Sequence, residues 1–147
     1  MKIASNEYRY SDGDVPLTGF LVRPDDVPEQ PAPAVLLVHG GGGLDEHART
    51  QAKRYAALGY IVLACDMFGA GVAGDRGRIV AALTAMRDDP DLLLQRVTSG
   101  LEALRTVPDV ADSCAAPSPV VTQLPAAAVT RTPLSARESR LPTRRRT

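Results

Sequence analysis

The sequence Ala-Val-Leu-Leu-Val-His-Gly-Gly-Gly-Gly-Leu, residues 34–44, decides how the rest of the chain is interpreted. Val35 to Val38 form an apolar run that is too short for a helix, and Pro33 and the glycines bound it, which is typical of a strand buried on both faces. Four consecutive glycines after such a strand expose backbone N–H groups at the carboxyl edge of a sheet, where open α/β sheets bind ligands. We interpret the glycines as a cradle for an anion or oxyanion; a flexible strand-to-helix connection is the alternative.

The segments around this stretch predict an α/β fold. Apolar residues recur at helical spacing after Asp45, which is a good N-cap, and a second two-face-buried strand follows, so that strand, helix and strand form a parallel βαβ unit. An Asp-Gly turn between two strand-like runs predicts an antiparallel hairpin before it. Asp91 is expected to cap the last helix, along which Leu94, Val97, Leu101 and Leu104 repeat. The expected strands are 7–11, 17–23, 34–38 and 60–64, and the expected helices are 45–58, 78–87 and 91–106.

Length and composition predict one soluble domain followed by a tail of different character. The 147 residues contain 44% hydrophobic side chains and carry no net charge. The zero sum hides an acidic body, residues 1–110 with a net charge of −4, and a basic tail, residues 111–147 with a net charge of +4. We find no apolar run of membrane-spanning length and no apolar leader at the start, so a cytoplasmic protein is expected. Two cysteines without metal-type spacing predict neither a disulfide framework nor a metal site.

The tail 111–147 interrupts the alternation of strands and helices that the earlier residues predict. After the last expected helix another buried strand should follow, but the tail has no Gly, Ile, Phe, Tyr or Met and is rich in Ala, Arg and Pro. Such a composition buries too little apolar surface to offset chain ordering, so we expect disorder or an out-of-frame, non-native C-terminus. A basic arm that binds nucleic acid is the alternative, and we favour it less.

Several segments together resemble the dienelactone hydrolase family of α/β-hydrolases over about residues 5–110. They are the strand with its His39–Leu44 turn, then Ala-Lys-Arg-Tyr-Ala-Ala-Leu-Gly-Tyr-Ile-Val-Leu-Ala (52–64), Asp-Met-Phe-Gly (66–69) and Gly-Leu-Glu-Ala-Leu (100–104). The resemblance implies a partial α/β-hydrolase fold, with a mostly parallel sheet, an N-terminal antiparallel hairpin and flanking helices. It implies hydrolysis of a small-molecule ester or lactone by a Cys or Ser, His, Asp triad, without metal or organic cofactor.

The resemblance also assigns roles to the turn. One donor of the family's oxyanion hole comes from the loop after the strand at 35–38, so the N–H of Gly41 is the first choice, with Gly40 and Gly42 adjacent. His39 is expected to shape this loop through hydrogen bonds of its ring rather than to act as a general base. Many relatives carry an acidic residue directly after the motif histidine, and this chain has Gly40 there.

The triad itself is missing from the sequence. Neither Gly-x-Ser-x-Gly nor Gly-x-Cys-x-Gly occurs, and no histidine follows His47. We therefore expect little or no turnover from this chain. The alternative function is that of a non-catalytic fragment or binding module, which could self-associate through exposed sheet edges.

Three further residues carry side chains that could take part in chemistry. Cys65 at a strand end is expected to be a small buried side chain, Cys114 a free thiol in the tail, and His47 a surface residue. Residues 69–74, Gly-Ala-Gly-Val-Ala-Gly, match the dinucleotide-binding pattern G-x-G-x-x-G, but Asp75, Arg76 and Gly77 separate the match from the next helix. A dinucleotide-binding βαβ domain is accordingly the weaker alternative.

Overall fold

A computed structural model describes residues 2–26 and 31–110 of the chain. The expectations for the tail 111–147 and for Cys114 fall outside these residues. The elements are β1 (Ile3–Asp12), β2 (Val15–Pro24), β3 (Ala34–Val38), α1 (Glu46–Ala56), β4 (Ile61–Cys65), α2 (Arg76–Asp88) and α3 (Pro90–Arg105). The predicted order of strands and helices is confirmed, and the two hairpin strands are longer at both ends than the sequence indicated.

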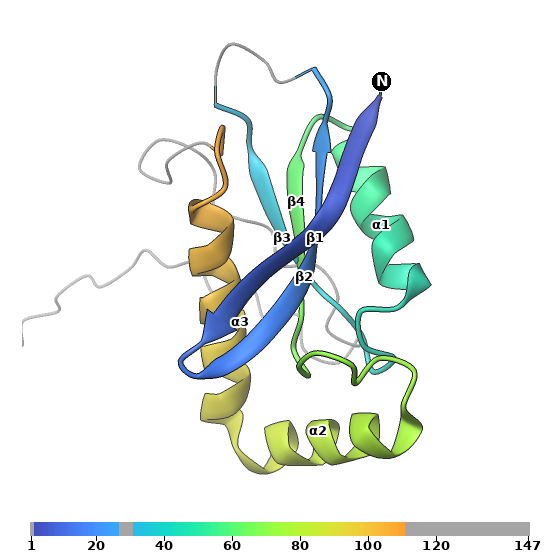
Figure 1. Ribbon diagram of the computed structural model, residues 1–147, viewed down its shortest axis with the longest axis vertical. Helices are drawn as coiled ribbons and strands as arrows, with labels where there is room; N and C mark the ends of the chain where they lie inside the picture. Colours follow the sequence, from blue (N-terminus) through green and yellow to red (C-terminus); the bar gives the residue numbers. More distant parts are fainter. Residues whose placement is uncertain (1, 27–30, 111–147) are drawn as a thin grey trace, which may run out of the picture.

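The four strands form one sheet in the order β1-β2-β4-β3 (Figure 1). The hairpin β1–β2 is antiparallel, β2 pairs antiparallel with β4, and β3 pairs parallel with β4. Within the described residues the sheet is thus mixed, because the long N-terminal hairpin contributes two of the three pairings. The parallel pair, with α1 as its crossover, is the βαβ unit expected from the sequence.

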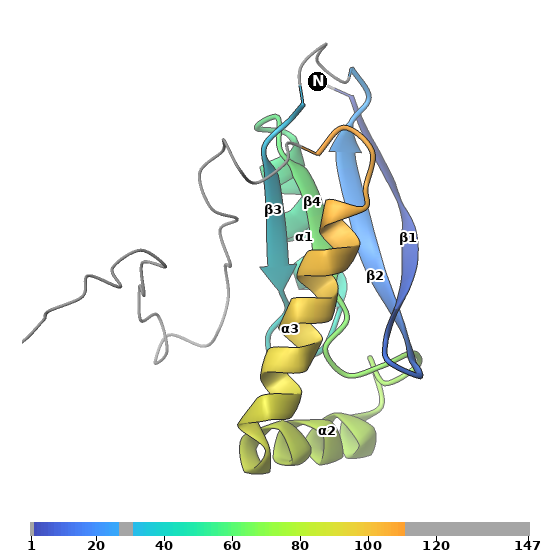
Figure 2. The ribbon, with the colours of Figure 1, turned by 90° about the vertical axis from the view of Figure 1, so that its left-hand side faces the viewer.

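Helices cover both faces of the sheet. α1 lies on one face and α3 on the other, while α2 lies crosswise below the end toward which β3 runs (Figures 1 and 2). Side chains of β3 and β4 alternate between the two sides: Leu36 and Leu63 pack toward α3, whereas Val35 and Val62 pack toward α1. Because both faces are covered, all five residues of β4 are buried, which explains its continuous apolar sequence.

The ends of α1 follow from local chemistry. The side chain of Asp45 accepts a hydrogen bond from the N–H of Ala48 at 3.0 Å, so the predicted N-cap is confirmed. The helix ends at Ala56, two residues earlier than expected, and Gly59 takes a positive φ of 96° in the turn that leads to β4. A glycine is favoured there because L side chains rarely adopt that conformation.

The start of α3 differs from the sequence prediction. Asp89, not Asp91, is the N-cap: its carboxylate accepts from the N–H groups of Asp91 and Leu92, and Pro90 occupies the first helical position. Proline suits that position because its missing N–H would be unpaired there anyway. Leu94, which was expected on the buried face, is 64% exposed.

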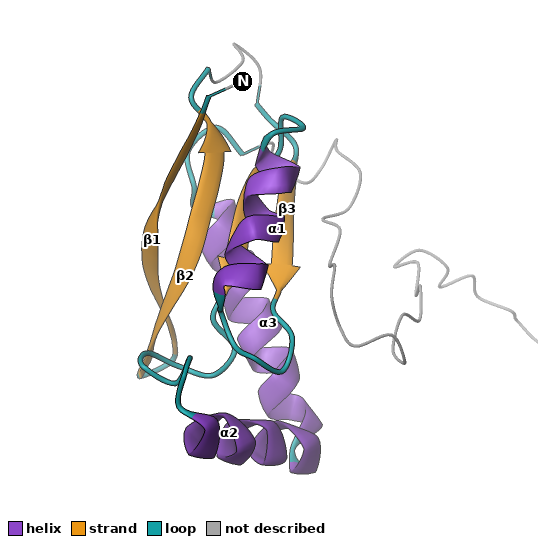
Figure 3. Cartoon of the chain, turned by 90° about the vertical axis from the view of Figure 1, so that its right-hand side faces the viewer, coloured by secondary structure: helices purple, strands orange, loops and turns teal. Residues whose placement is uncertain are grey.

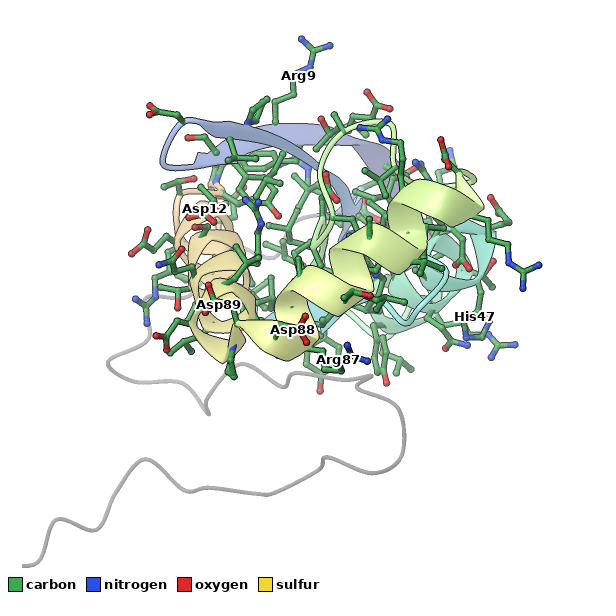
Figure 4. The ribbon with its side chains drawn as sticks, turned by 90° about the horizontal axis from the view of Figure 1, so that it is seen from below. Arg9, Asp12, His47, Arg87, Asp88 and Asp89 are labelled. Atoms are coloured by element: carbon green, nitrogen blue, oxygen red, sulfur yellow. The ribbon has the colours of Figure 1, made fainter. Side chains whose placement is uncertain are left out.

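An ion pair fastens α3 to the hairpin. Nη1 of Arg96 donates to Oδ2 of Asp12 at 3.0 Å, and Oγ of Ser99 donates to Oδ1 of the same carboxylate at 3.0 Å. Figure 4 shows Asp12 at the hairpin end beside α3. Arg96 is buried, so the pair lies in a medium where a lone charge would be costly, and it fixes where the helix crosses the end of β1.

Gly100 lets α3 approach the sheet closely. A Cβ atom at this position would lie 2.9 Å from Cβ of Cys65 and 3.4 Å from Cδ1 of Leu36. At Gly100 the backbone of α3 therefore lies directly against the strands that carry the candidate site.

We predict that Gly100→Ala destabilises the fold by about 1–3 kcal/mol, although alanine is the better helix former, because the added methyl forces α3 away from β4. The free energy of unfolding from urea titrations measures this. Gly77→Ala is the matched control, since a Cβ in α2 meets its nearest neighbour at an ordinary 3.6 Å. Equal stability of Gly100→Ala and wild type would show that the packing is looser than described.

Candidate functional site

The glycine turn lies at the carboxyl end of β3, on the way to α1. Figure 3 shows this loop at the same end of the sheet as α2. The N–H of Gly43 donates to the carbonyl of Gly40 at 3.1 Å, and Gly43 has a positive φ of 82°. Gly40, Gly41 and Gly42 are exposed, whereas His39 is buried. The structure therefore puts the three predicted donor residues on the surface of the turn and the histidine beneath it.

The ring of His39 joins the ends of β3 and β4. Nε2 accepts a hydrogen bond from the N–H of Met67 at 3.1 Å, and Nδ1 lies 2.8 Å from the carbonyl oxygen of Gly40. The ring also meets Phe68 edge-on, with 4.7 Å between the centroids. One side chain thus connects the glycine turn to the loop that follows the neighbouring strand.

These contacts determine the protonation of His39. A backbone N–H can only donate, so Nε2 must be the unprotonated acceptor, and the single proton of the neutral ring sits on Nδ1, where it donates to Gly40. Burial lowers the pKa of His39, and the nearby hydrogen bond and carboxylates only partly oppose this. The ring is neutral at pH 7 and has both nitrogens engaged, so it has no free nitrogen with which to act as a general base.

The hydrogen bonds to Gly40 orient the next peptide. Its carbonyl oxygen accepts from His39 and from Gly43, so it faces the ring and the inside of the turn. In a planar trans peptide the C=O and the following N–H point in opposite directions. The N–H of Gly41 therefore points away from the ring, and among the described residues it has no hydrogen-bond acceptor.

The loop after β4 is held by Asp66, a role that was not predicted from the sequence. The buried carboxylate accepts from the N–H groups of Phe68 and Gly69 at 3.1 and 2.9 Å, and from that of Thr18 on β2 at 3.2 Å. An aspartate followed three residues later by glycine is a signal for such a turn, and it was available in the sequence. Asp66 fixes the loop from which Met67 donates to His39.

The structure also locates Cys65 and His47, two other residues that could take part in chemistry. Cys65 is completely buried, as expected, and burial raises the pKa of its thiol to about 12, so it is no nucleophile at neutral pH. His47 is exposed, as expected, and lies at the periphery of the molecule in Figure 4. Within residues 2–26 and 31–110, no group of three or more His, Cys, Asp or Glu side chains is placed to hold a metal ion.

The second glycine-rich segment, residues 69–74, leads into α2 but does not form a nucleotide-binding unit. α2 is followed by α3 rather than by a parallel strand. Oδ1 of Asp75 accepts from the N–H of Arg78 at 3.1 Å, so a carboxylate already occupies the helix N-terminus where a phosphate would bind. This arrangement argues against the dinucleotide alternative.

Comparison with known proteins assigns the family. The model of the dienelactone hydrolase family matches residues 17–114. The chain belongs to the dienelactone hydrolase family. No curated protein matches the sequence significantly. None of the helices that the structure describes is both long and apolar enough to cross a bilayer.

Solved structures of dienelactone hydrolases and similar proteins share the fold. A protein called m3DLH is 28% identical, with a TM-score of 0.68, over 74% of this chain and 45% of its own. The dienelactone hydrolase-like promiscuous phosphotriesterase P91 from metagenomic libraries is 27% identical, with a TM-score of 0.69, over 76% and 46%. A dienelactone hydrolase from Anabaena variabilis, 20% identical with a TM-score of 0.54 over 75% and 48%, agrees in fold. The matched part of the chain thus spans less than half the length of each.

The bonds of His39 predict how stability depends on pH. The folded state disfavours the charged ring, so below the ordinary pKa of 6.5 the unfolded chain binds more protons. The stability that the fold gains from holding the ring neutral is complete above pH 6.5 and declines as the pH falls below it. We expect the free energy of unfolding to drop between pH 7.5 and 5.5 in urea titrations, and His39→Gln to remove part of that drop.

His47→Gln is the control for this experiment, because the exposed ring of His47 makes no hydrogen bond to the described residues. It makes the same replacement at an exposed ring, so the difference between the two variants isolates the effect of burying the ring. An identical pH dependence in the wild type and His39→Gln would contradict the buried, neutral state of His39.

Proposed function

We propose that this chain carries the oxyanion-binding part of a hydrolase that cleaves carboxylic esters or lactones. The observation that supports the proposal most directly is the orientation of the Gly40–Gly41 peptide, whose carbonyl is engaged by His39 while its N–H points outward without a partner among the described residues. Gly41 is the principal donor, with Gly40 and Gly42 beside it. His39 shapes the loop and does not touch the substrate.

The chemistry explains why a fixed, unpaired N–H is useful. When a nucleophile attacks an ester carbonyl, negative charge develops on the carbonyl oxygen. A donor that is already oriented stabilises that charge without reorganisation, and loss of one such donor costs on the order of 10²–10³ in rate. The donor alone supplies no group that attacks the carbonyl carbon.

The 147 residues contain no Gly-x-Ser-x-Gly or Gly-x-Cys-x-Gly elbow and no histidine beyond the two already placed. Cys65 is buried and protonated, and both ring nitrogens of His39 are occupied. We therefore propose that the chain by itself has little or no hydrolytic activity and that turnover requires a nucleophile supplied by a further polypeptide segment.

We expect Gly41→Pro to lower hydrolysis of p-nitrophenyl acetate and of a dienelactone by about 10²–10³-fold in an enzyme that joins residues 1–110 to the C-terminal part of P91, because proline removes the N–H donor. Initial rates measure the effect. The 147-residue chain alone, assayed alongside, should match the buffer rate.

Gly41→Ala is the matched control, because it keeps the donor and its Cβ would meet only Cδ1 of Leu83, at 3.9 Å. Its rate should stay close to wild type. Equal losses in both variants, or turnover by the chain alone well above buffer, would contradict the proposal.

A second function, as a self-associating binding module, is favoured by the outer edge of β3. The carbonyl of Pro33 accepts a hydrogen bond from the N–H of Ile61 in β4, so the backbone groups of every second residue from 33 onward point toward β4. The backbone groups of Ala32, Ala34 and Leu36 therefore point to the opposite, outer edge. On that side the described residues contribute one parallel bridge, between Ala32 and Val110. Beyond this bridge the described residues leave the N–H and C=O groups of the apolar edge unpaired, and such groups can pair with a strand of a second copy.

We predict that the wild-type chain elutes above monomer size in size-exclusion chromatography, increasingly so with concentration. Ala34→Pro should shift it toward monomer with unchanged circular dichroism, because proline removes an outward N–H without breaking the ladder to β4. Val35→Pro, which removes a donor on the β4 side, should instead unfold the sheet. A wild type that stays monomeric at all concentrations would contradict self-association.

A further inference from the structure

An apolar hollow of about 220 Å³ opens beside the glycine turn. Its walls are formed by the end of β3, the loop after β4, and the helices α2 and α3. The lining residues include His39, Gly40, Met67, Phe68, Leu83 and Met86. An apolar cavity of about 150 Å³ is enough to bind benzene, and the hollow is larger than that. It is thus large enough for a short hydrocarbon chain.

The wall contributed by α2 is partly open to solvent. Met86 packs against the core, whereas Leu83 is 42% exposed, and Val80 on the same helix face is 55% exposed. Apolar side chains gathered on one helix face and left open to solvent are a feature of binding sites. Leu83 also reaches the turn, since its Cδ1 lies 3.9 Å from where a Cβ of Gly41 would be. The open apolar wall therefore lies beside the residue that carries the proposed donor.

One charged residue lies at the rim of the hollow. Arg87 lines the hollow, but its Nε lies 3.1 Å from Oδ1 of Asp88, and both side chains are mostly exposed. Figure 4 shows the two residues together at the end of α2. Because an exposed pair of this kind contributes little, the preference of the hollow comes from its other side chains, which apart from His39 are apolar and favour a hydrocarbon group.

We propose that this hollow binds the hydrocarbon part of a short, unbranched acyl group, whose carbonyl or carboxylate oxygen accepts from Gly41. The inference rests on the proposed oxyanion role of the turn and adds the substrate class, aliphatic monoesters and the monocarboxylates released from them. Because the donor and the hollow are both formed by described residues, the chain binds such carboxylates even without a nucleophile.

The test is an NMR titration of the 147-residue chain, labelled at glycine ¹⁵N and at leucine and methionine methyls, with acetate, butyrate, hexanoate and octanoate. Each added methylene should tighten binding about fourfold until the hollow is full, as expected for burial of a CH₂ group. The amide of Gly41 and the methyl of Met86 should shift on the same binding curve.

Leu83→Asp should abolish the dependence on chain length, because it puts a charge in the wall at a position that tolerates solvent. Leu94→Asp is the matched control on α3: Leu94 is 64% exposed and is not part of the wall, so the dependence should persist.

Affinities that do not vary with chain length, or a response of Gly41 without Met86, would overturn the inference and leave the oxyanion role standing. A response of Met86 without Gly41 would overturn both, because the oxygen would not be at the turn. No binding of octanoate at millimolar concentration would overturn the inference, while the rates of the joined enzyme still decide the oxyanion role separately.

Discussion

The two hydrogen bonds of the His39 ring are the constraint on which the rest of the site depends. By accepting from Met67 and donating to Gly40, the ring sets the spacing between the loops that follow β3 and β4. Without it, a turn of four glycines would sample many conformations, since glycine loses more backbone freedom on ordering than any other residue. The buried imidazole thus turns a flexible stretch into one with a defined N–H direction.

The same arrangement is the reason why we propose a positioning role for the histidine instead of a catalytic one. A general base needs a free nitrogen within reach of the proton that it removes, and burial together with two hydrogen bonds denies this to His39. The residue acts through the peptide that it holds. Asp66 does the equivalent work on the other loop, where one carboxylate accepts three backbone N–H groups and keeps Met67 in place. The cradle is therefore built by polar side chains beneath it, while its surface is bare main chain.

The sequence predicted the features that depend on local pattern. The apolar run at 34–38, the glycine turn and the Asp45 cap were recognisable because strand burial, turn chemistry and capping each leave a short-range signature. Features made by distant residues were not recognisable. The Arg96–Asp12 pair joins positions 84 residues apart, and the local sequence around neither residue predicts the contact. The cap of α3 was placed two residues late because Asp89 and Asp91 both suit an N-cap, and only the position of Pro90 distinguishes them.

The most direct test of this account is the tautomer of His39, read from the long-range ¹H–¹⁵N NMR spectrum of the imidazole ring at pH 7. The account predicts a neutral ring protonated at Nδ1, with Nε2 unprotonated and accepting from Met67. A ring protonated at Nε2, or at both nitrogens, would break the bond to Met67, leave the Gly40–Gly41 peptide unfixed, and contradict the assignment of Gly41 as an oriented donor.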